Sequence, residues 1–105
     1  MNDIQRTRFE TRAAILKALA HPTRLFMIEE LAEKSYCVQE LTEMVGLDVS
    51  TVSKHLSILK NAGLVTVEKK GKRVFYSLRV RCALNFLNCV EAVLKEQVQD
   101  RMDAI

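Results

Sequence analysis

The reactive side chains of this 105-residue chain are few: three cysteines and two histidines. Three thiolates, from Cys37, Cys82 and Cys89, are the ligands that arsenite or a similar soft ion would use. Two neighbouring thiols would instead serve a disulfide- or persulfide-type redox switch. Neither His21 nor His55 has a convincing catalytic partner near it in the sequence, so we do not expect an enzyme.

The spacing of the cysteines limits which of them could act together. Cys82 and Cys89 are seven residues apart on a predicted helix, which separates them by roughly 10 Å along the axis. Because metal–sulfur bonds are near 2.3 Å, these two thiols cannot share one ion within a continuous helix. Cys37 precedes a predicted helix, whose dipole favours a reactive thiolate, and it would have to meet one of them across the fold or across a dimer. The alternative, that all three cysteines only pack, stays open.

A second group of side chains is suited to nucleic acid. Short hydroxyls and cations follow Asp48 on one face of a predicted helix, where they could contact base edges and phosphates in the major groove. A basic hairpin follows and could reach a neighbouring backbone or minor groove. The candidate DNA-contacting residues are Ser50, Thr51, Ser53, Lys54, His55, Ser57 and Lys60 on the helix, and Lys69, Lys70, Lys72 and Arg73 on the hairpin. For His55, a packing role is the alternative.

The charge distribution points the same way. Between Ser50 and Arg81 there are eight basic residues and one acid, Glu68, which gives that segment a charge of +7. The rest of the chain carries −4, so a net charge of only +3 conceals a strongly polarised molecule. Such a segment predicts a surface for phosphates, with an unevenly charged but merely solvated surface as the alternative.

Helices and one hairpin must position these groups. Apolar spacing predicts a mainly α fold with one β-hairpin, a winged helix-turn-helix in which four helices precede the hairpin and a fifth follows it. Asp48 is predicted to cap the fourth helix, whose buried side would carry Val49, Val52, Leu56 and Leu59. The predicted helices span 5–20, 22–34 and 38–45, then a fourth that begins at Val49 and is stopped by Asn61-Ala62-Gly63, and a last one at 80–102. The predicted strands span 64–67 and 74–78 around a turn at 68–73.

The whole chain, 1–105, is predicted to be one domain, because its length and composition are those of a single small globular unit. The first and last predicted helices carry apolar stripes larger than a winged core can cover, which predicts a homodimer through these two helices. No apolar run approaches the roughly 20 residues that span a bilayer, and the polar N-terminus lacks the apolar stretch of a signal peptide. We therefore expect a cytoplasmic protein without membrane contact.

Four stretches of the sequence resemble the ArsR/SmtB family of bacterial and archaeal repressors, and the likeness covers nearly the whole chain. It is weakest before Thr11 and after Val90. The matching stretches are Leu19-Ala20-His21-Pro22-Thr23-Arg24-Leu25, Val38-Gln39-Glu40-Leu41 and the run from Val49 to Val65, continued by Arg73-Val74-Phe75-Tyr76-Ser77-Leu78. The resemblance implies a homodimer that represses by binding duplex operator DNA and is released by a metal ion, a metalloid or a redox signal. Two alternatives stay open: a winged-helix regulator without metal or thiol sensing, and a winged-helix protein-interaction module.

The family's known effector sites match this chain poorly. Its zinc site on the last helix needs histidines, and the last predicted helix has none. Its arsenic sensors carry Cys-Val-Cys at the start of the third helix, where this chain has Cys37-Val38-Gln39. No cofactor is therefore certain. If the chain senses an effector, the candidates are a thiophilic metal or metalloid ion, or a redox or persulfide signal, at Cys37, Cys82 and Cys89.

Overall fold

The computed structural model describes residues 1–104 and contains five helices and a small sheet in that range. The helices are α1 (Asp3–Leu19), α2 (Pro22–Glu33), α3 (Val38–Val45), α4 (Val49–Asn61) and α5 (Cys82–Asp103). The strands are β1 (Tyr36–Cys37), β2 (Val65–Lys70) and β3 (Arg73–Leu78), which form an antiparallel sheet in the order β1-β3-β2. The mainly α winged helix-turn-helix expected from the sequence is confirmed.

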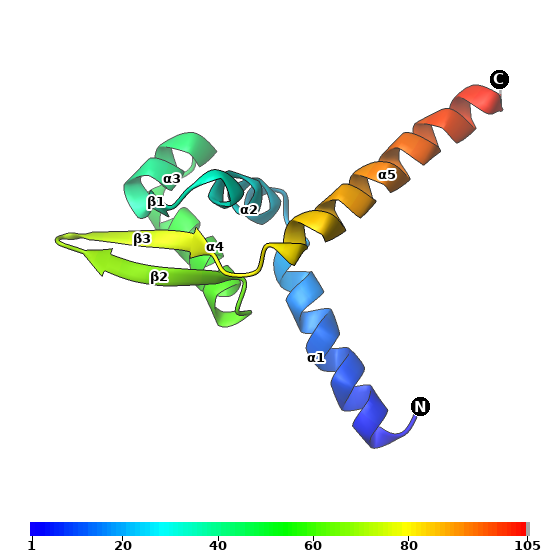
Figure 1. The fold of residues 1–105 in the computed structure, drawn as a ribbon, viewed down its shortest axis with the longest axis horizontal. Helices are drawn as coiled ribbons and strands as arrows, with labels where there is room; N and C mark the ends of the chain where they lie inside the picture. Colours follow the sequence, from blue (N-terminus) through cyan, green and yellow to red (C-terminus); the bar gives the residue numbers. More distant parts are fainter. Residues whose placement is uncertain (105) are drawn as a thin grey trace.

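Helices α2, α3 and α4 surround the core, and the sheet covers it. Its fully buried members include Met27 and Ile28 of α2, Leu41 of α3 and Leu56 and Leu59 of α4. Figure 1 shows the β2–β3 hairpin projecting from one side of this unit and α1 and α5 projecting from the other. The radius of gyration is 16.6 Å, against about 13 Å for a compact domain of this length. The two projecting helices explain the difference.

Local signals set the boundaries of the helix-turn-helix. Gly46 adopts a left-handed conformation, with φ of +79°, and ends α3. The Asp48 side chain caps α4 by accepting a hydrogen bond from the Thr51 N–H at 3.1 Å. His21 caps α2 in the same way, because its Nδ1 accepts from the Thr23 N–H at 3.1 Å.

Three expectations need correction. Strand β1 adds a third strand, in which Tyr36 pairs with Tyr76 and Cys37 with Phe75. The hairpin turn is shorter than expected, because pairing between β2 and β3 continues to Lys70 and Arg73 on either side of the turn. Val49, expected on the buried side of α4, is 53% exposed because the first turn of α4 lies at the edge of the core.

Candidate nucleic-acid interface

Helix α4 has one buried face and one open face, as a DNA-reading helix requires. Val52, Leu56 and Leu59 are 0% exposed and fix the helix on the core. The open face carries most of the polar residues expected to contact DNA. Of these, Ser50, Lys54, Ser57 and Lys60 are exposed, and Thr51 and Ser53 are half-buried.

The first turn of α4 has a defined hydrogen-bond arrangement around Asp48. The Ser50 hydroxyl donates to Asp48 Oδ2, and the Thr51 hydroxyl donates to Asp48 Oδ1 at 2.6 Å. These bonds, together with the Thr51 N–H, hold the pKa of Asp48 well below its ordinary value. Because their protons bond to Asp48, both hydroxyls are left with lone pairs, which could accept from a base amino group.

The wing gathers positive charge at its tip. Lys70 and Arg73 are opposite each other in the last pair of the β2–β3 register, and Gly71 and Lys72 form the turn between them. Like charges directly opposite on neighbouring strands destabilise a hairpin, and an anionic partner would reverse that effect. The Lys70 ammonium lies 5.6 Å from the centre of the Phe75 ring, so part of its charge is held against the strand. Lys69, Lys72 and Arg73 are exposed around it.

His55 differs from the other candidate residues on α4. It is half-buried, its Nδ1 lies 3.0 Å from Nη1 of Arg24, and its ring centre lies 4.4 Å from that of His21. The geometry favours the packing role over direct contact with DNA. Sequence reasoning gave Arg24 no role, although one signal was present: a cation in the first turn of α2 opposes the helix dipole and so needs another partner.

The cysteines do not form the expected three-thiol site within one chain. Among residues 1–104, no group of three or more His, Cys, Asp or Glu side chains is placed to hold a metal ion. Cys37 is buried at 1% exposure, whereas Cys82 and Cys89 are exposed on α5. The Cys37 N–H donates to Glu40 Oε1 at 3.0 Å, and this bond, with one from the Cys37 thiol, lowers the pKa of Glu40.

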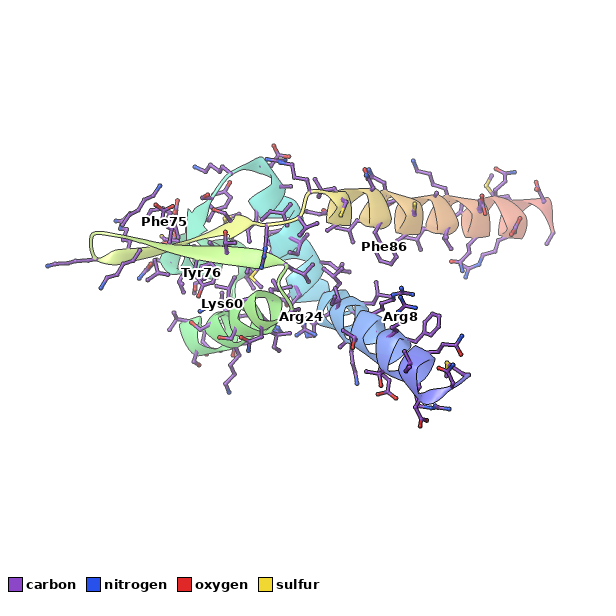
Figure 2. The ribbon with its side chains drawn as sticks, turned by 60° about the horizontal axis from the view of Figure 1, so that its bottom comes forward. Arg8, Arg24, Lys60, Phe75, Tyr76 and Phe86 are labelled. Atoms are coloured by element: carbon purple, nitrogen blue, oxygen red, sulfur yellow. The ribbon has the colours of Figure 1, made fainter. Side chains whose placement is uncertain are left out.

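Helices α1 and α5 leave much of their apolar surface open. A groove of ≈ 320 Å³ lies where α1 and α5 diverge. Figure 2 shows Phe86 on the side of α5 that faces the angle between the two helices. The groove is lined by Leu16, Leu19, Ala20, Leu25, Phe86, Leu87 and Val90. Within the described chain, no helix is both long and apolar enough to span a bilayer.

The known proteins reported below, which resemble this chain in sequence and in fold, are transcriptional regulators. Residues 21–67 match the family model described as bacterial regulatory protein, arsR family. The biofilm growth-associated repressor of Xylella fastidiosa is 32% identical over 85 residues, which cover 81% of this chain and 75% of that protein.

Solved structures agree with the sequence matches. NolR from Sinorhizobium fredii superposes with a TM-score of 0.82 at 27% identity, covering 89% of this chain and 93% of that one. The homodimeric winged helix-turn-helix DNA-binding domain of Mb0332 from Mycobacterium bovis gives a TM-score of 0.80 at 26% identity, covering 95% and 93%. From its sequence and its fold, this chain belongs to the ArsR family of winged helix-turn-helix regulatory proteins.

Proposed function

We propose that the protein is a dimeric transcriptional repressor that binds a specific duplex operator through α4 and its wing. The observation that carries the proposal is the pairing of Lys70 with Arg73 at the hairpin tip, beside a helix whose open face is polar. A protein-interaction module would not need like charges to face each other across two strands. The similar protein from Xylella fastidiosa is itself named a repressor.

The homodimer is supported by the apolar surface that a single chain leaves exposed. Helix α1 has 17 residues and buries only Ala18 and Leu19, whereas isolated helices are marginal in water. On α5, Phe86 is 45% exposed and Val93 is 54% exposed. A second copy packed on α1 and α5 would cover these faces, and in a C₂ arrangement the two α4 helices would fall about one DNA turn apart. The similar Mycobacterium bovis domain is described as homodimeric.

Thiol sensing is the second part of the proposal, and it is assigned to the exposed Cys82 and Cys89 of α5. In a dimer through α5, their modification would act at the subunit interface and change the separation of the two α4 helices. A soft ion would need thiols from both subunits, because one chain does not gather three ligands among its described residues. Cys37 serves packing in this proposal, because it is buried and its N–H is bonded to Glu40.

The test of DNA binding starts from a pool of random 30-base-pair duplexes, from which the protein selects its operator. Fluorescence anisotropy then compares the selected duplex with a scrambled one. Tighter binding to the selected duplex by roughly a thousandfold is expected for a specific regulator. Equal affinity for both at moderate salt would refute the proposal.

The test of thiol sensing uses the same selected duplex. Arsenite, cadmium or polysulfide is added to the parent, to Cys37→Ser and to the double variant Cys82→Ser/Cys89→Ser. Release from DNA is expected in the parent and in Cys37→Ser, and it should be lost in the double variant. A parent that responds to none of the three reagents would remove the thiol part and leave the DNA-binding part intact.

A further inference from the structure

The Arg24 side chain links α4, the proposed recognition helix, to the end of α1. Its Nε donates to the carbonyl oxygen of Ala18 at 2.5 Å, and its Nη1 donates to Nδ1 of His55 at 3.0 Å. Figure 2 places Arg24 at the junction between α4 and α1. One rigid guanidinium therefore bonds two elements that come from different parts of the chain.

Apart from the Arg24 hydrogen bonds, α1 and α4 make little direct packing contact. A groove of ≈ 450 Å³ separates the second half of α1 from the last turns of α4. It is lined by Ala14, Lys17, Ala18, Arg24, Ile58, Asn61 and Ala62. Because the groove leaves the two helices without close-packed contact there, the angle between α1 and α4 depends more strongly on the two Arg24 hydrogen bonds.

The histidines around Arg24 have defined hydrogen-bonding roles. Because a guanidinium only donates, Nδ1 of His55 must accept and the ring must be neutral. Nδ1 of His21 accepts from the Thr23 N–H, and its ring lies 4.4 Å from the His55 ring. Burial lowers the pKa of His55, and the neighbouring His21 and Arg24 lower it further.

We propose that Arg24 is a positioning residue, which sets the angle of α4 relative to α1 and thereby the separation of the two recognition helices in the dimer. The inference rests on the proposed function, since it assigns α1 to the dimer interface and α4 to the operator. A dimer reads two half-sites at a fixed spacing, so a change in this angle alters which spacing fits. The cation in the first turn of α2 is then explained by its partners on α1 and α4.

The DNA test compares spacing and not only affinity. The parent, Arg24→Met and Arg24→Lys are titrated with the selected duplex and with duplexes whose half-sites lie one base pair nearer or farther. We expect Arg24→Met to bind the selected duplex roughly tenfold more weakly. Its binding to the two altered duplexes should be unchanged, so its spacing preference is lost. Arg24→Lys keeps the charge but replaces the two separated donor nitrogens, Nε and Nη1, by one ammonium on a flexible stem, so it should lose the preference too. It replaces Arg24→Met if that variant does not fold.

His55→Asn tests the acceptor, because asparagine offers an oxygen near the position of Nδ1 but does not titrate. At pH 8 its spacing preference should equal the parent's. As pH falls below about 6.5 the parent should lose the preference, since protonated His55 can no longer accept from Arg24 and would carry a positive charge beside Arg24 and His21. His55→Asn should keep it. Equal weakening on all three duplexes in the Arg24 variants would show a merely structural role and overturn the inference.

A measurement without DNA separates this inference from the proposed function. Residual dipolar couplings of the amides of α1 and α4 report the angle between the helices in the free protein. The angle should change, or average over a wider range, in Arg24→Met relative to the parent. If the couplings of the two proteins fit the same angle, the inference fails even where the parent binds its operator. If the parent selects no operator, the proposed function fails, and the couplings alone decide whether Arg24 fixes α4.

Discussion

Replacing Lys72 at the tip of the wing by glutamine should change how DNA binding depends on salt. Lys72 is exposed in the turn between β2 and β3, where its ammonium can reach a phosphate. Each phosphate contact contributes about 0.9 to the slope of log affinity against log salt concentration. A dimer has two wings, so Lys72→Gln should reduce the slope by about 1.8.

That slope translates into a difference that is easy to measure. Between 50 and 200 mM salt, the parent should lose about twelvefold more affinity than Lys72→Gln, because a fourfold change in salt acts through a slope difference of about 1.8. Fluorescence anisotropy on the selected duplex, at four or five salt concentrations, gives both slopes. The matched control is Lys34→Gln, which removes one positive charge outside the hairpin, from a residue whose ammonium lies 4.9 Å from the centre of the Tyr36 ring.

The outcome that refutes this reasoning is specific. If Lys72→Gln and the parent have the same slope while Lys34→Gln also matches them, the wing tip makes no phosphate contact. If Lys34→Gln reduces the slope as much as Lys72→Gln does, net charge and not the wing explains the effect. In either case the tip's positive charge would need another explanation.

Three further predictions concern the elements that present α4 to DNA. Leu56→Ala should lower the free energy of unfolding by about 2–5 kcal/mol, since Leu56 is 0% exposed, and urea denaturation followed by circular dichroism measures it. Asp48→Asn should make the free energy of unfolding less dependent on pH in acid. A carboxyl with a lowered pKa stabilises the fold above its ordinary pKa and loses that contribution as pH falls through its folded pKa. Urea midpoints measured from about pH 5 to pH 3 should therefore fall less in the variant than in the parent. Phe86→Glu should convert a dimer to a monomer in analytical ultracentrifugation, and a variant that stays dimeric would exclude this face from the interface.

The helix-turn-helix could be predicted from the sequence because its signals are local. Gly46 supplies the left-handed residue after α3, and Asp48 caps α4 two residues later, so α3 has its predicted bounds, Val38–Val45, and α4 begins at Val49 as predicted. The apolar spacing of Val52, Leu56 and Leu59 correctly predicted the buried face of α4. Each of these signals acts within one or two turns of chain, where propensity and capping decide the conformation.

Strand β1 and the length of the hairpin depend on contacts that the sequence pattern does not display. A two-residue strand has no periodicity to detect, and Tyr36 and Cys37 become a strand only because β3, some forty residues later, pairs with them. In the hairpin, the charged residues from Glu68 to Arg73 have low strand propensity and suggested a long turn. The pairing of their backbones around Gly71, whose φ is +63°, overrides that propensity.

The position of Cys37 shows why the sensing chemistry could not be inferred from the sequence in the same way. A thiol before a helix predicts a thiolate stabilised by the helix dipole. In the fold, the Glu40 carboxylate accepts the Cys37 N–H, and β1 pairing places Cys37 in the interior. Because Cys37 is buried, a thiol-directed reagent in water has little access to it. Reactivity depends on such surroundings, which are made by distant segments, whereas helix capping depends on the residues next in the chain.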